Sequence, residues 1–149
     1  MELVPEFSFT GMLKPPLPIG GPFGQRTFFE VIGGEVTGER LKGRVLTGGG
    51  DWALVGADGI VRLDVRAQFQ THDDANILIA YHGVLEFNEA VQNALATGGG
   101  TDWGDQYFRT TPRFETGDDR YAWLTRTVFV GEGRLLPHTG VEYRVSRVA

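Results

Sequence analysis

The sequence of 149 residues contains no cysteine. This absence excludes disulfide bonds, thiolate nucleophiles and cysteine-based zinc sites. Serine is nearly absent too, because Ser8 and Ser146 are the only two and neither lies in a G-x-S-x-G motif, which excludes the nucleophile elbow of a serine hydrolase. The three histidines show neither His-x-His nor His-Glu-x-x-His spacing, so we expect no metal site and no cofactor.

Lysine is scarce, because Lys14 and Lys42 are the only two among 14 basic residues and arginine supplies the rest. The net charge is −5. We expect no nucleic acid partner, since neutralising phosphates requires concentrated basic residues. Arginine forms planar, bidentate contacts with carboxylates, which suits charge pairs on strands. A compositional bias of the genome explains the arginine excess equally well.

Long hydrophobic runs are absent, so no segment is long enough to span a bilayer as a helix. Residues 1–5 contain no basic stretch followed by an apolar one, and no signal peptide is expected. These absences predict a cytoplasmic protein without a membrane partner. The length suits one domain, residues 1–149, with a sizeable core.

Glycine is abundant, with 22 residues spread through the chain, which indicates many turns and hence many short strands. Expected strands are 7–12, 26–32, one or two within 35–46, 52–55, 61–71, 76–87, 107–115 with a break at Pro112, 121–131 and 140–148. The proline-rich segment 14–22 is expected to be a loop, lid or rim, because proline donates no ladder hydrogen bond. One short helix is expected between the N-cap Asn88 and the glycines 98–100.

No strand-helix-strand alternation is visible, which argues against a parallel α/β fold. The sequence therefore predicts an all-β protein, either an antiparallel barrel or a sandwich. We favour the barrel, because polar and aromatic residues share strand faces in several places, as expected for walls around a cavity.

The clearest pattern is the strict alternation of residues 61–70, which predicts a strand with two unlike faces. Its apolar positions are Val61, Leu63, Val65, Ala67 and Phe69, and its polar positions are Arg62, Asp64, Arg66, Gln68 and Gln70. Alternation in antiparallel sheets usually means a solvated polar face. If the polar face instead lines a cavity, Asp64 and Arg66 form part of a ligand site.

Charged and phenolic residues on three strands are the candidates for catalysis: Asp64, Arg66, Tyr81, Arg109 and Glu115. Asp64 or Glu115 would act as a base and Tyr81 as a proton donor. The arginines would hold a carboxylate or stabilise an enolate oxygen. The alternative is structural pairing, for example of Arg109 with Glu115.

The candidates for ligand binding are mostly aromatic: Asp51, Trp52, Phe114, Tyr121 and Trp123. Ordinary core packing is the commoner role of buried aromatic side chains and remains the alternative for these residues.

Several motifs, taken in order, resemble a known family. They are Gly24-Gln25-Arg26, Gly33-Gly34, Gly48-Gly49-x-Asp51-Trp52, Asp58-Gly59-x-x-x-Leu63-Asp64-x-Arg66, Tyr81-x-Gly83, Tyr107-Phe108-Arg109-Thr110-x-Pro112-x-Phe114-Glu115 and Tyr121-x-Trp123-Leu124. This pattern resembles domain of unknown function 3237, also called uncharacterised protein family 0311, over nearly the whole chain. The resemblance implies a lipocalin-like or allene-oxide-cyclase-like barrel with Asp64, Arg66, Tyr81 and Arg109 in its interior, and it implies no established activity.

Together these observations predict an intracellular barrel that binds a small polar or aromatic molecule. The protein would isomerise, cyclise or dehydrate this molecule without a cofactor, or only carry it. A structural or assembly role is the third alternative. Exposed apolar strand faces would need cover, which predicts a homodimer or a higher homo-oligomer.

Overall fold

The computed structural model describes residues 1–149 and contains eleven strands, one α-helix and one 3₁₀ segment. The elements are β1 (Leu3–Leu13), β2 (Leu17–Gly20), β3 (Gln25–Gly38), β4 (Gly43–Val45), β5 (Gly49–Val55), β6 (Ile60–Thr71), β7 (Asn76–Glu86), α1 (Glu89–Thr97), β8 (Phe108–Thr110), β9 (Arg113–Glu115), η1 (Asp119–Arg126), β10 (Phe129–Leu136) and β11 (Gly140–Val148).

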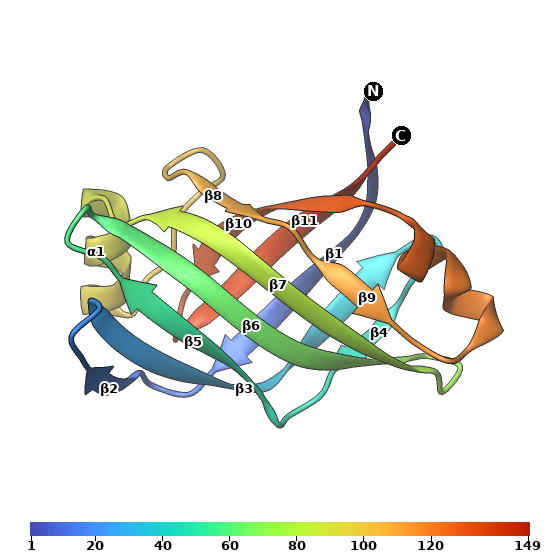
Figure 1. Cartoon of the computed structure of the whole chain (residues 1–149), viewed down its shortest axis with the longest axis horizontal. Helices are drawn as coiled ribbons and strands as arrows, with labels where there is room; N and C mark the ends of the chain where they lie inside the picture. Colours follow the sequence, from blue (N-terminus) through green and yellow to red (C-terminus); the bar gives the residue numbers. More distant parts are fainter.

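The sheet closes into an antiparallel barrel in the order β1-β3-β5-β6-β7-β8-β10-β11, with β11 pairing back to β1 (Figure 1). β9 continues the line of β8 along β7 after the interruption at Pro112. β4 lies between β3 and β6 and continues the line of β5 in the barrel wall. β2 pairs with the first residues of β3. The predicted all-β barrel with one short α-helix is confirmed.

α1 covers one end of the barrel, whereas η1 and both termini lie toward the opposite end (Figure 1). The Asn88 side chain accepts a hydrogen bond from the amide of Val91 at 3.0 Å, as an N-cap does. Gly98 ends the helix in the left-handed conformation, with φ of 71°. Both ends of α1 were expected from the sequence.

Two sequence predictions need correction. Residues 121–126 belong to η1 rather than to a strand, because Asp118 caps the segment and Tyr121 and Leu124, three residues apart, are its buried side chains. The proline-rich segment is not wholly a loop. It contains β2, which pairs only with β3, and such an edge position tolerates Pro18.

The core inside the barrel is rich in aromatic rings. Tyr143 is 1% exposed, and its ring centre lies 4.9 Å from that of Phe9 and 5.3 Å from those of Tyr81 and Phe108. The ring of Phe108 lies flat over Gly133 of β10, where an added Cβ would come within 2.8 Å of the ring. Glycine at this position therefore lets the ring and the strand approach closely.

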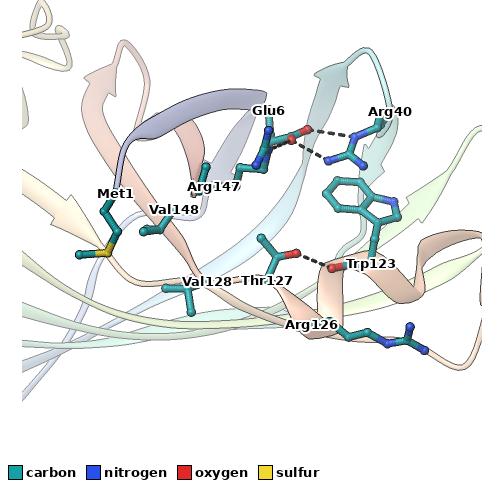
Figure 2. Close-up of a pocket in the computed structure, with 10 residues that line it drawn as sticks. Met1, Glu6, Arg40, Trp123, Arg126, Thr127, Val128, Arg147 and Val148 are labelled. Atoms are coloured by element: carbon teal, nitrogen blue, oxygen red, sulfur yellow. Dashed lines mark hydrogen bonds and ion pairs between the residues drawn. The ribbon is translucent and has the colours of Figure 1, made fainter.

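A group of charged residues ties the η1 end together. Glu6 is the extra residue of a bulge in β1, and its side chain is only 9% exposed. Its carboxylate accepts from Arg40 at 2.6 Å and from Arg147 at 2.9 Å, and the Arg40 guanidinium lies 3.8 Å from the centre of the Trp123 ring. These side chains line an open groove of about 810 Å³ beside the termini. Figure 2 shows how they lie.

Removal of the Glu6 carboxylate is expected to destabilise the barrel. The Glu6→Ala variant leaves two arginines without their shared partner, and we expect a loss of about 1–3 kcal/mol in the free energy of unfolding. Denaturant unfolding followed by tryptophan fluorescence measures this loss. Lys14→Ala is the control, because the Lys14–Glu30 pair is exposed and should contribute less than about 0.5 kcal/mol. Equal losses for the two variants would contradict the structural role of Glu6.

Candidate functional site

The interior of the barrel is hollow at the α1 end. A cavity of about 270 Å³ lies between inward-facing side chains of the strands and one face of α1, and 14 of the 21 residues that line it are hydrophobic. Phe29, Leu63 and Phe108 form part of its wall, and Ala94 and Leu95 come from α1. This is a partly open, mainly apolar cavity of the kind that holds small ligands.

Asp51 is the only ionisable residue that lines this cavity. It shares the inward face of β5 with Ala53 and Val55, since alternate residues of a strand point the same way. Burial raises the pKa of the Asp51 carboxyl group to about 6. The negative charge of Asp64 also raises this pKa, whereas a hydrogen bond from the Asp64 amide, at 3.0 Å, and the charge of Arg26 lower it.

Two tyrosines lie close to Asp51, inside the barrel. Tyr81 of β7 and Tyr143 of β11 are both buried, and their ring centres lie 5.3 Å apart. Burial is the main cause that raises the pKa of both phenols well above the usual value of 10, and the charge of Asp51 adds to this effect. Both phenols therefore keep their protons at neutral pH.

The expectation that Asp64 and Arg66 point inward is wrong. Both side chains are exposed on the outside of β6, where Asp64 lies 3.4 Å from His82 across the strand pair. The inward positions of β6 carry the apolar residues instead. A barrel of eight strands has an interior that side chains fill, so the apolar face must turn inward and the charged face outward.

Arg109 and Glu115 also lie outside the barrel, contrary to the expectation for Arg109. Both are exposed, and no ion pair joins them. The Arg109 guanidinium donates to the Phe108 carbonyl at 3.0 Å and lies 5.0 Å from the centre of the Tyr107 ring. The inward residues of β8 and β9 are Phe108, Thr110 and Phe114, because the alternation continues unchanged through Pro112.

The aromatic residues expected around a ligand occupy three separate regions, none of them at the cavity. Trp52 points outward, is 43% exposed and packs on Phe28 with ring centres 4.8 Å apart. Phe114 packs in the core against Phe129 at 5.2 Å. Tyr121 and Trp123 belong to η1 at the far end, where the Tyr121 hydroxyl donates to Asp73 at 2.7 Å.

Of the ten residues expected at a site, Asp51 lines the cavity, and Tyr81 is buried in the core against Phe9 and Tyr143. Sequence reasoning missed Tyr143, Arg26 and the α1 residues of the cavity wall. The inward position of Asp51 did have a signal, because it shares its parity with the apolar residues Ala53 and Val55. No comparable signal marked Arg26, whose contacts are to a neighbouring strand.

No cluster of three or more histidine, aspartate or glutamate side chains is arranged to hold a metal ion. None of the helical segments has the length and apolar character needed to cross a membrane.

Comparison with known proteins gives the family of this chain. The family model described as "Protein of unknown function (DUF3237)" matches residues 1–148. A UPF0311 protein from Clostridium acetobutylicum is 34% identical over 133 residues, which cover 88% of this chain and 84% of that protein.

Solved structures share the fold. A protein of unknown function from Rhodopseudomonas palustris superimposes with a TM-score of 0.89 at 30% identity, covering 99% of this chain and 97% of that chain. An enzyme from Penicillium herquei superimposes with a TM-score of 0.71 at 23% identity, covering 97% and 93%, and this likeness concerns the fold alone. By sequence over its whole length and by its barrel, the chain belongs to the DUF3237 family, also named UPF0311.

Proposed function

We propose that this barrel binds a small, largely apolar ring compound in the cavity beneath α1 and that Asp51 exchanges a proton with it. The observation that carries this proposal is a single carboxyl group in an otherwise apolar cavity of about 270 Å³. Apolar walls with one placed polar group are typical of sites that orient a small molecule. The ligand therefore needs a mainly apolar body and one hydrogen-bond donor.

The size of the cavity limits the ligand. An engineered apolar cavity of about 150 Å³ in another protein accommodates benzene. A cavity of about 270 Å³ is nearly twice as large, which suits a compound of two fused rings or a ring with a short side chain. The ligand is accordingly smaller than most drug-sized molecules.

The chemistry that fits Asp51 is proton transfer. With a pKa of about 6, Asp51 is mostly ionised at neutral pH and yet regains a proton readily. Such a group removes a proton from one position of a ligand and returns it at another, as isomerisation or cyclisation requires. These reactions balance without an oxidant, a reductant or a cofactor. The buried phenols of Tyr81 and Tyr143 stay protonated in this pH range, so Asp51 rather than a phenol exchanges the proton.

A carrier without catalytic activity would use the same cavity and release its ligand unchanged. The ionisable carboxyl group in the cavity wall favours catalysis. Of the ten residues expected at a site from the sequence, this proposal uses Asp51. A cytoplasmic location and a homo-oligomeric assembly stay predictions from the sequence.

Binding of a matched pair of ring compounds tests the cavity and its carboxylate. We expect 2-naphthol to bind at pH 7.5 more tightly than 2-methylnaphthalene, which has nearly the same shape but no donor. Asp51→Asn should weaken 2-naphthol binding by about tenfold or more, because a hydrogen bond to a charged acceptor is lost. Fluorescence titration of 2-naphthol measures the affinity, and competition with it measures that of 2-methylnaphthalene.

Two variants control this experiment. Asp64→Asn removes a nearby carboxylate outside the barrel and should leave the affinity unchanged. Ala53→Leu adds three carbon atoms to the cavity wall beside Asp51 and should abolish binding of both compounds. If both compounds bind equally to the original protein, or if Asp64→Asn matches Asp51→Asn, the proposed role of Asp51 is wrong.

The raised pKa of Asp51 predicts a specific pH dependence of stability. Its pKa is about 6 in the folded protein and 3.8 ordinarily, so the folded state holds this proton more tightly than the unfolded state. The contribution of Asp51 to stability therefore falls as the pH rises from about 4 to about 6 and stays constant above that range. Over the whole range, the contribution of Asp51 to the free energy of unfolding falls by about 3 kcal/mol.

Asp51→Asn isolates this effect from all other titrating groups. The variant lacks the ionisable carboxyl group, so its stability relative to the original protein should increase by about 2–3 kcal/mol between pH 4 and pH 7. Urea unfolding at both pH values gives this difference. A difference between the two proteins that is the same at both pH values would show that Asp51 ionises at its ordinary pKa.

A further inference from the structure

One backbone hydrogen bond of the barrel wall is replaced beside Asp51. β5 and β6 pair at Gly50–Arg66 and Asp51–Val65 and again at Leu54–Arg62, but Trp52 does not pair with Asp64. In a regular antiparallel ladder the Asp64 amide would donate to the Trp52 carbonyl. Here it donates to the carboxylate of Asp51 at 3.0 Å. The side chain of Asp51 thus takes a position that the main chain normally occupies.

The Trp52 carbonyl receives another donor in exchange. The guanidinium of Arg26, on the neighbouring strand β3, donates to this oxygen at 2.9 Å. Arg26 is half-buried and forms no ion pair. It therefore acts on its neighbours through the hydrogen bond to the Trp52 carbonyl and through its positive charge. An unsatisfied carbonyl in a sheet costs free energy and would compete for the nearest amide, which is that of Asp64.

We propose that Arg26 is a positioning residue, which occupies the Trp52 carbonyl and thereby leaves the Asp64 amide free to hold the carboxyl group of Asp51 in the cavity wall. This inference rests on the proposed function only in giving Asp51 a role toward a ligand. The arrangement itself belongs to the ligand-free protein. Without Arg26, the Asp64 amide returns to the Trp52 carbonyl and Asp51 loses its donor.

The charged and titratable groups around Asp51 determine in which direction its pKa changes when Arg26 is replaced. Asp64 faces it from β6, Arg26 from β3, Tyr81 from β7 and Tyr143 from β11. Loss of Arg26 removes a positive charge and, through the amide, a hydrogen bond to the carboxylate. Both changes raise the pKa of Asp51. The bond and the charge are separable, because glutamine can donate to the carbonyl without carrying a charge.

The test uses NMR titration of the ligand-free protein. The amide proton of Asp64 should change its chemical shift with a midpoint near pH 6, and Asp51→Asn should abolish that change. In Arg26→Met the chemical shift of the Asp64 amide proton should no longer change when Asp51 titrates. The midpoint of the Asp51 titration should rise by about one pH unit. In Arg26→Gln the Asp64 amide should still follow Asp51. Arg109→Met, an exposed arginine outside the barrel, should change neither.

Each outcome decides the inference. If the Asp64 amide does not follow Asp51 in the original protein, the inference is wrong whatever the variants do. If Arg26→Met and Arg26→Gln raise the Asp51 midpoint equally while the Asp64 amide shift still changes with the Asp51 titration, Arg26 acts through its charge alone. In that case it does not position the Asp51 carboxyl group. Failure of 2-naphthol to bind leaves these results untouched and contradicts only the proposed function.

Discussion

Closure of eight antiparallel strands leaves every second residue facing a narrow interior, and apolar side chains must fill that interior. The barrel meets this constraint with aromatic rings around Tyr143. The apolar face of β6 has to turn inward, and its charges have to turn to solvent. A hollow persists beneath α1, where a helix rather than a strand closes the end. The location of the candidate site thus follows from how the sheet closes.

Asp51 departs from this pattern at a single position. A carboxylate inside such a barrel loses its water, and burial accordingly raises its pKa to about 6. The wall accommodates the charge by giving up one main-chain hydrogen bond and using the Asp64 amide as its donor. The ionisable group in the apolar cavity and the irregularity in the β5–β6 ladder therefore have the same cause, which is the hydrogen bond from the Asp64 amide to Asp51.

The fold could be predicted from the sequence because turns and alternation are local signals. The spread glycines predicted turns, Asn88 predicted the start of the helix, and Pro112 predicted a break between strands, each at its own position. The orientation of β6 was predicted wrongly, because alternation defines two faces and only closure decides which one is interior. η1 was missed because Tyr121 and Trp123 fit a strand, whereas the burial of Leu124 reveals a period of three. The contact of Arg26 with Trp52 joins residues 26 positions apart, so no short motif encodes it.

Gly133 has a consequence for how ligand preference diverges among related barrels. It faces the ring of Phe108, and that ring forms part of the cavity wall. Any side chain at position 133 would displace the ring, although residue 133 is not itself part of the lining. The volume open to a ligand is thus encoded partly in a second layer of residues. Homologues that keep every lining residue and differ only at this glycine would select compounds of different size.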